Sequence, residues 1–164
     1  MELKNLKGKI VTLKPLREFF FPQYLKMFSP KVRELLHVSS KDSEIEYLYD
    51  RLEKQKEGKT FFYCIFDNET GLLVGAIEIR NPQEADSQLY SWLNEKYWGT
   101  GRYQEALRLV SEKYFEQSRT SFYRANVDIS NIRSYKALKK YGFIDSGLKK
   151  GPHGGQYMLI CRRK

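Results

Sequence analysis

The sequence is poor in the residues that build disulfide frameworks and metal sites. Its 164 residues include only two cysteines and two histidines. Cys64 and Cys161 stand alone in apolar, strand-like segments, without metal-ligand spacing or a Cys-x-x-Cys pair. We therefore expect two buried thiols and no bound metal.

Long apolar runs, repeats and linkers are also missing. No segment approaches the roughly 18 apolar residues of a membrane span, and the first ten residues lack the apolar region of a signal peptide. We therefore expect a cytoplasmic protein without a membrane partner. No Gly/Ser/Pro-rich linker or internal repeat divides the chain, so we expect a single domain over residues 1–164.

The charge is unevenly distributed along the chain. The net charge is +9, and residues 131–164 hold nine Lys or Arg against one acid, Asp145. Residues 41–57 hold six acids against four bases. A basic segment of this kind is attracted to nucleic acid, an acidic partner or a polyphosphate ligand, or is simply a solvated surface.

The order of apolar patterns predicts a mixed fold. We expect strands at 9–16, 60–66, 72–80, 87–93, 122–129 and 156–162, and helical segments at 17–28, 43–58, 101–118 and 131–141. Ser43 and Glu46 have the spacing of a capping box for the second helical segment. The order β-α-α-β-β-β-α-β-α-β indicates an α/β (mixed α+β) fold with a mostly antiparallel central sheet flanked by helices.

The segment "EKYWGTGRYQEALRL" at 95–109 places Gly99 and Gly101 at the start of a predicted helix. Glycine inside a helix costs about 1 kcal/mol relative to alanine, so a tight turn or a close backbone approach must explain the pair. Because a helix N-terminus has unpaired N–H groups and the positive end of the helix dipole, the segment also fits an anion-binding site. Both interpretations stay open on this segment alone.

Three segments in this order resemble the GNAT superfamily of acyl-CoA-dependent N-acetyltransferases. The motif from Lys96 to Gly101 is similar to that family's Gln/Arg-x-x-Gly-x-Gly/Ala phosphate-binding signature, with Lys96 in the place of Gln or Arg. The segments "SWLNEKYWGTGRYQEAL" and "NIRSYKALKKYGFIDSG", together with the opening "LKGKIVTLKPL", resemble the branch of ribosomal-protein N-terminal acetyltransferases. A tyrosine that some members place seven residues after the motif asparagine is Leu138 here.

The resemblance implies acetyl-CoA as the acyl donor. It implies that the fourth and fifth strands splay apart, that the backbone near the end of the fourth strand contacts the pantetheine arm, and that the N–H groups of 98–102 hold the diphosphate. The coenzyme-binding residues implied in this way are Trp92, Leu93, Asn94, Lys96, Tyr97, Trp98, Gly99, Thr100, Gly101, Arg102 and Asn131. Asn131 also fits a helix N-cap.

Two residues are candidates for catalysis. The resemblance places Ser134 near the coenzyme sulfur, where its hydroxyl would assist the leaving thiolate; the alternative is a serine that bonds the backbone of the first helical turn. Glu78, an acid in the mostly apolar "LLVGAIEIR", is a candidate general base or a salt-bridge partner of a neighbour such as Arg80. We expect His37 to pack in the core and His153 to lie in a loop.

The predicted function is acetyl transfer from acetyl-CoA to a primary amine by direct attack, with a peptide or protein N-terminus as the favoured acceptor. An α-amine carries one charge and is more readily neutral at pH 7 than a lysine or polyamine amine. The alternatives are a polyamine or antibiotic acetyltransferase, a basic nucleic-acid- or ribosome-binding module, and a coenzyme A sensor. No nucleic-acid-binding motif supports the module, and no feature of the sequence specifies an oligomeric state.

Overall fold

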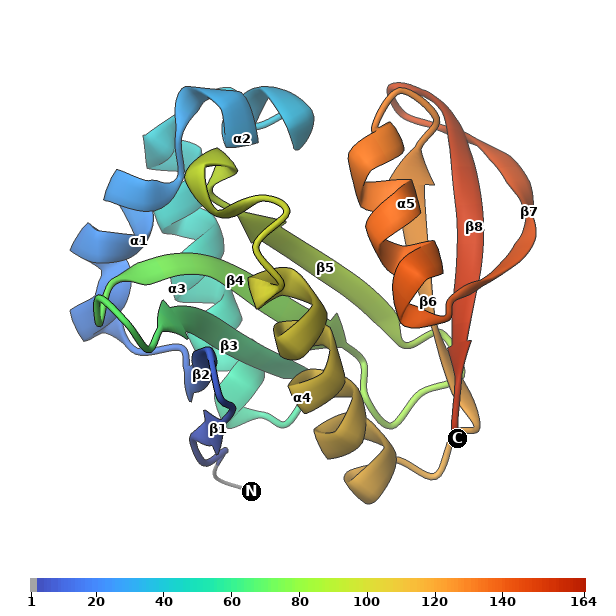
Figure 1. Cartoon of the computed structure of the whole chain (residues 1–164), viewed down its shortest axis with the longest axis horizontal. Helices are drawn as coiled ribbons and strands as arrows, with labels where there is room; N and C mark the ends of the chain where they lie inside the picture. Colours follow the sequence, from blue (N-terminus) through green and yellow to red (C-terminus); the bar gives the residue numbers. More distant parts are fainter. Residues whose placement is uncertain (1–2) are drawn as a thin grey trace.

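One twisted sheet forms the centre of the protein, and the computed structural model describes it within residues 3–164 (Figure 1). The strands are β1 Leu6–Lys7, β2 Val11–Pro15, β3 Thr60–Asp67, β4 Leu73–Arg80, β5 Gln88–Leu93, β6 Phe122–Asp128, β7 Ile144–Gly151 and β8 Gly154–Arg162. The α-helices are α1 Phe21–Met27, α2 Pro30–Leu35, α3 Lys41–Lys56, α4 Arg102–Gln117 and α5 Ile132–Tyr141. Short 3-10 turns lie at Glu18–Phe20 and Glu95–Tyr97.

The eight strands follow the order β1-β2-β3-β4-β5-β6-β8-β7. Every neighbouring pair is antiparallel except β5 and β6, which are parallel and are connected through α4. The two parallel strands share a single register pair, Gln88 with Arg124, beside the hydrogen bond from the Arg124 N–H to the Ser87 carbonyl (2.9 Å). Beyond this point β5 and β6 diverge, as the resemblance implied, and the opening widens toward the end of β5 (Figure 1).

Two apolar cores lie on the two faces of the sheet. The first packs α4 against the sheet through Leu107, Val110 and Tyr114, and it includes buried residues of strands β2 to β6 and of β8. The second packs α1 and α3 against the opposite face of β3, β4 and β5 and is rich in aromatic rings. Both thiols are buried, as predicted: Cys64 lies in the second core and Cys161 in the first.

The structure confirms the mixed, mostly antiparallel sheet and corrects several boundaries. The predicted helical region 17–28 is a 3-10 turn followed by α1, and α2 was not predicted. Strand β7 was also missed, because seven of its eight residues are exposed and it has no apolar pattern. The capping role of Ser43 is wrong: α3 starts at Lys41, and the hydroxyl of Ser40 accepts the N–H of Ser43 (3.1 Å). Within residues 3–164, no helix combines the length and apolar composition that a membrane crossing requires.

Candidate active site

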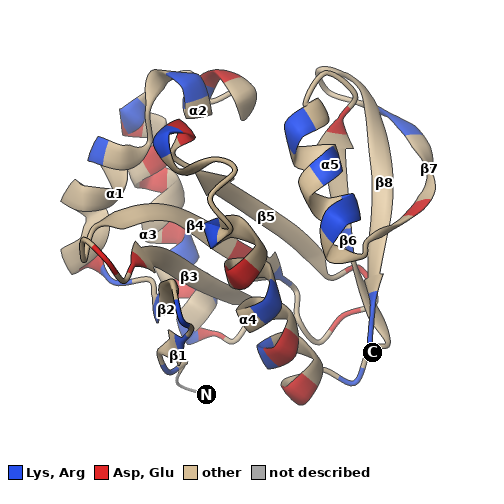
Figure 2. Ribbon diagram, viewed as in Figure 1, with Lys and Arg blue, Asp and Glu red and all other residues tan. Residues whose placement is uncertain are grey.

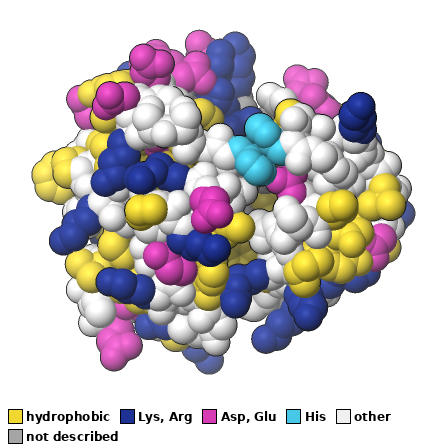
Figure 3. All heavy atoms as spheres, turned by 90° about the horizontal axis from the view of Figure 1, so that it is seen from above, with side chains coloured by type: hydrophobic (Ala, Val, Ile, Leu, Met, Phe, Trp, Pro, Cys, Tyr) yellow, Lys and Arg dark blue, Asp and Glu magenta, His cyan; other side chains and the backbone are white. Residues whose placement is uncertain are grey.

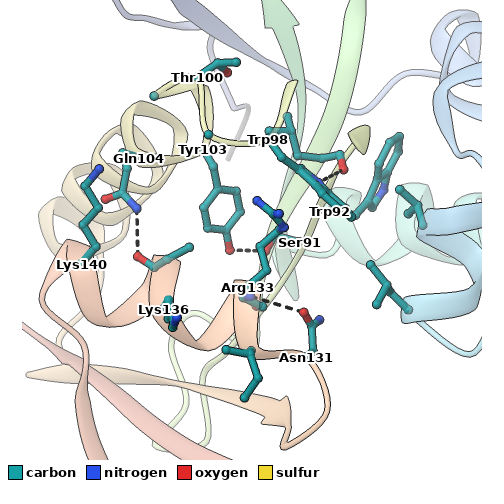
Figure 4. A pocket seen from close by; sticks show the side chains of 18 of the residues that line it. Ser91, Trp92, Trp98, Thr100, Tyr103, Gln104, Asn131, Arg133, Lys136 and Lys140 are labelled. Carbon is teal, nitrogen blue, oxygen red and sulfur yellow. Dashed lines mark hydrogen bonds between the residues drawn. The ribbon is translucent and has the colours of Figure 1, made fainter. Parts of the chain in front are cut away.

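A cavity of about 520 Å³ lies where β5 and β6 diverge (Figure 4). Its walls come from the end of β5, the first turn of α4, one face of α5 and the tip of α2. Eight of the predicted coenzyme or catalytic residues line it: Trp92, Leu93, Trp98, Gly99, Thr100, Gly101, Asn131 and Ser134. Two segments about 30 residues apart in the sequence, 92–101 and 131–134, therefore meet at this cavity.

The first turn of α4 forms one end of this cavity. Gly99 (φ 72°) and Gly101 (φ 82°) both have the left-handed backbone conformation that glycine adopts without steric cost. A Cβ at Gly99 would meet nothing within 4 Å, so open space adjoins the backbone there. The first hydrogen bond into α4 is donated by the Glu105 N–H (3.1 Å to the Gly101 carbonyl), which leaves the N–H groups of 102–104 without an acceptor among the described residues. This helix start fits a bound diphosphate.

A basic face of α5 stands opposite this helix start (Figure 2). Arg133, Lys136 and Lys140 line the same cavity, and the Arg133 guanidinium lies 4.5 Å from the centre of the Trp98 ring. These three cations were counted in the basic segment of the sequence but not assigned to the coenzyme. Their i, i+3, i+7 spacing, which places them on one face of a helix, was the signal that could have identified them.

The beginning of α5 carries the candidate thiolate partner. Asn131 caps the helix, and its side-chain oxygen accepts the N–H of Ser134 (3.3 Å), so its capping role is present. Among residues 3–164, no hydrogen-bond partner occupies the hydroxyl of Ser134, which belongs to the cavity wall. That hydroxyl is available to a ligand.

The β5 wall is held by side-chain hydrogen bonds. The Trp98 indole N–H donates to the Leu93 carbonyl (2.8 Å), and the hydroxyls of Tyr103 and Ser91 are 2.6 Å apart. Figure 4 shows Tyr103 reaching from α4 toward Ser91. Burial raises the pKa of Tyr103 to about 12, so its hydroxyl stays protonated at neutral pH. Gln104 donates to the Ala137 carbonyl (2.9 Å) and ties α4 to α5.

Four residues of the predicted coenzyme set do not line this cavity. Asn94 is buried, donates to a backbone carbonyl of α1 (2.9 Å) and accepts the N–H of Lys96 (3.1 Å). Arg102 points to the β3–β4 turn, where its Nε lies 3.0 Å from Asp67, and its guanidinium lies 5.3 Å from the Tyr97 ring centre. Lys96 and Tyr97 are likewise absent from the wall. The side chains of Asn94, Tyr97 and Arg102 therefore contact the surrounding protein rather than the cavity, and the Lys96 side chain is exposed.

A second cavity, of about 440 Å³, adjoins the first. The two share Leu36, Ser91 and Trp92, and the second extends over the sheet face that packs against α3. There the Trp92 indole N–H donates to the hydroxyl of Tyr24 (3.0 Å), which donates to Glu44 (2.7 Å). Burial raises the pKa of Glu44, and the hydrogen bond from Tyr24 offsets only part of that effect.

Glu78 lies in the same second cavity and is 2 % exposed. Its Oε1 accepts the hydroxyl of Thr60 (2.7 Å) and the guanidinium of Arg51 (3.2 Å). Its Oε2 accepts the hydroxyl of Tyr47 (2.5 Å) and lies 3.4 Å from Nε of Arg80. The salt-bridge alternative for Glu78 is therefore present, while its role as a general base stays a prediction.

The two histidines bring the segment after α2 into contact with the β7–β8 turn (Figure 3, cyan). His37 is exposed rather than packed in the core, so that prediction is wrong; it follows α2 with φ 56°. Its ring stacks on His153 of the β7–β8 turn (3.9 Å between centroids), and its Nε2 lies 2.7 Å from Asp128. Burial alone would raise the pKa of Asp128, but hydrogen bonds from Gln156 and His37 lower it.

Comparison with known proteins identifies the family. The family model described as an acetyltransferase (GNAT) domain matches residues 11–144. The chain belongs to the GNAT acetyltransferases. It is accordingly an acetyl-CoA-dependent N-acetyltransferase. No curated protein matches the chain significantly.

Solved structures share this GNAT fold at low sequence identity. RimL, a ribosomal L7/L12 α-N-protein acetyltransferase solved with coenzyme A, is 14% identical, with 96% of this chain and 97% of that chain covered and a TM-score of 0.83. An acetyltransferase from Salmonella typhimurium that modifies the N-terminal serine of L7/L12 is 14% identical, covers 98% and 99%, and has a TM-score of 0.86. Mycobacterium smegmatis RimJ, solved with a coenzyme A disulfide, is 17% identical, covers 97% and 84%, and has a TM-score of 0.79. At these identities the likeness establishes the fold.

Proposed function

We propose that this GNAT enzyme acetylates an amine that carries a single positive charge, with the α-amine of a peptide or protein N-terminus as the favoured acceptor. One observation carries the proposal: within residues 3–164, Glu44 is the carboxylate of the cavity beside the coenzyme site that forms no ion pair. Similar structures named as ribosomal-protein N-terminal acetyltransferases support the same class of acceptor.

The first cavity fits acetyl-CoA. When bound, acetyl-CoA supplies the acetyl group in an activated thioester. The free N–H groups at the start of α4 are suited to hold the diphosphate, and Lys136 and Lys140 add positive charge on the opposite wall. The hydroxyl of Ser134, which lines this cavity, would stabilise the leaving thiolate by donating a hydrogen bond.

The second cavity fits the acceptor amine. It meets the first at Ser91 and Trp92, so an amine bound there lies next to the coenzyme site. Glu78 is compensated by Arg51 and Arg80, whereas Glu44 forms no ion pair within the described chain. A cavity with one uncompensated carboxylate accommodates one ammonium group and does not favour a polyamine.

The two carboxylates are suited to different roles. Glu78 accepts hydrogen bonds from Tyr47, Arg51 and Thr60, and the cations Arg51 and Arg80 compensate its charge. Glu44 has a raised pKa and one donor, Tyr24, so it is the better acceptor for a proton at neutral pH. We assign attraction of the ammonium group and removal of its proton to Glu44, and we assign Glu78, the predicted base, to holding Tyr47 and Arg80 in the cavity wall.

A thiol-release assay tests this proposal. The enzyme is supplied with acetyl-CoA and a panel of N-terminal peptides, spermidine, aminoglycosides and free amino acids. We expect turnover on peptides with a free α-amine and none on the same peptides after chemical blocking of that amine. Turnover on spermidine or an aminoglycoside without turnover on peptides would assign the enzyme to small-molecule amines. Binding of acetyl-CoA without turnover on any amine would favour the coenzyme-sensor alternative.

A further inference from the structure

A third cavity, of about 380 Å³, lies farther along the same face of the sheet. It is formed by the β4–β5 connection, the start of β5, β6, β7 and β8, whereas the coenzyme site lies at the end of β5. Three cations line it, Arg80, Arg124 and Lys149, against one acid, Asp86. The neutral part of its wall includes the side-chain amides of Gln88 and Asn126, which also bind carboxylates through hydrogen bonds.

The third cavity adjoins the acceptor cavity. Arg80 and Tyr90 line both, with the Arg80 guanidinium 3.5 Å from the centre of the Tyr90 ring. A second contact holds this guanidinium, because its Nη2 donates to the hydroxyl of Tyr47 (2.6 Å). The stacked pair therefore forms a wall that the two cavities share.

The two cavities differ in the charge of their lining residues. Glu44 and Glu78 against Arg80 line the acceptor cavity, whereas Arg124 and Lys149, in addition to the shared Arg80, against Asp86 line the third cavity. We propose that the third cavity is a subsite for a carboxylate, and that the preferred acceptor is a peptide N-terminus with an acidic side chain at its second or third residue. This inference rests on the proposed function and specifies its substrate.

The dimensions of β5 set the position of that side chain. Trp92 marks the junction with the coenzyme site, and Gln88, four residues earlier on the strand, lies in the third cavity. At about 3.3 Å per residue these two positions are about 13 Å apart. An extended peptide covers a similar length per residue, so two to three residues plus a side chain connect the amine to the third cavity.

The same arrangement opposes a second ammonium group. A polyamine or a peptide with lysine at its second or third residue would bring positive charge to Arg124 and Lys149. Repulsion between these like charges lowers the affinity for such a substrate. Each partly exposed ion pair with an acidic side chain contributes a few tenths to about 1 kcal/mol to its binding. We expect kcat/KM for a peptide with Asp at this position to exceed that for the same peptide with Asn by about three- to tenfold.

The test compares C-terminally amidated hexapeptides that differ only at residues two and three, with Asp, Asn or Lys there. Amidation removes the terminal carboxylate, so a preference for Asp reports the side chain; a parallel set with free C-termini measures any contribution of the chain end. We expect the order Asp, then Asn, then Lys in kcat/KM. Arg124→Ala and Lys149→Ala should each reduce the preference for Asp, and Arg124→Glu should shift it toward Lys.

Arg119→Ala is the matched control, because Arg119 is exposed and follows α4 at the end of the helix opposite the coenzyme site. This variant should keep the wild-type order of peptides. Equal kcat/KM for the Asp and Asn peptides, or an unchanged preference in Arg124→Glu, would overturn the inference while leaving the proposed function intact. Absence of turnover on every peptide would overturn both.

Discussion

Replacing Glu44 with glutamine should stabilise the protein and impair its reaction with amines. Burial disfavours the charged form of this carboxyl and raises its pKa in the folded state. Folding therefore takes up protons in the window from the ordinary glutamate pKa up to the raised value, and wild-type stability decreases as the pH rises through that window. Above it, the ionised carboxylate destabilises the fold.

The size of the effect follows from what the substitution changes. Glutamine keeps an oxygen that can accept the hydroxyl of Tyr24 and removes only the buried charge. We expect a gain on the order of 1 kcal/mol at pH 8, where the charge costs most. For a chain of this size, that gain raises Tm by about 2–4 °C. At the acid side of the window the gain should vanish, because wild-type Glu44 is then protonated.

Thermal unfolding from pH 5 to pH 8 measures this effect, and Glu46→Gln is the control. Glu46 lies on the same helix but is exposed, so its substitution should change the free energy of unfolding by less than about 0.5 kcal/mol. The Glu44→Gln enzyme should also lose most of its kcat/KM for peptides while its affinity for acetyl-CoA stays unchanged. A Glu44→Gln protein with the wild-type pH dependence and full activity would refute both the buried charge and its role.

Three further variants test the coenzyme site. Acetyl-CoA at 100 times its Kd should stabilise the wild-type protein by about 2.7 kcal/mol. Gly101→Glu places a carboxylate beside the proposed diphosphate site, so the same concentration should cause little thermal shift in this variant. An undiminished shift would contradict the site. Ser134→Ala should lower kcat with little change in coenzyme affinity, and unchanged turnover would remove its assigned role. Lys136→Ala combined with Lys140→Ala should weaken coenzyme binding and reduce its salt dependence, whereas Lys139→Ala, whose amine pairs with Asp145 (2.7 Å), should not.

Local sequence patterns and the family resemblance together predicted eight of the residues that line the first cavity. The Gly99 and Gly101 pair carries its own structural signal, since left-handed backbone at a helix start requires glycine. Asn131 signals a helix start in the same local way, and the resemblance added the place of Ser134. The splay of β5 from β6 also followed from the resemblance.

The acceptor side depends on contacts that no local pattern reveals. In the sequence, Glu44 is one of six acids in residues 41–57, and nothing distinguishes it from the others. Its burial depends on contact with Tyr24, 20 residues earlier. Strand β7 was missed because it has no alternating pattern and is defined by its pairing with β8. His37 and His153 are 116 residues apart, and only the fold brings their rings into contact.

The most direct test of the central claim is the position of the acetyl group on a peptide that offers two amines. A peptide with a free α-amine and a lysine at its sixth residue is incubated with enzyme and acetyl-CoA, and the product is mapped by fragmentation mass spectrometry. Because more of an α-amine than of a lysine side chain is neutral at pH 7, the account predicts one acetyl group, on the α-amine. Acetylation of the lysine side chain, with the α-amine unmodified, would contradict the account.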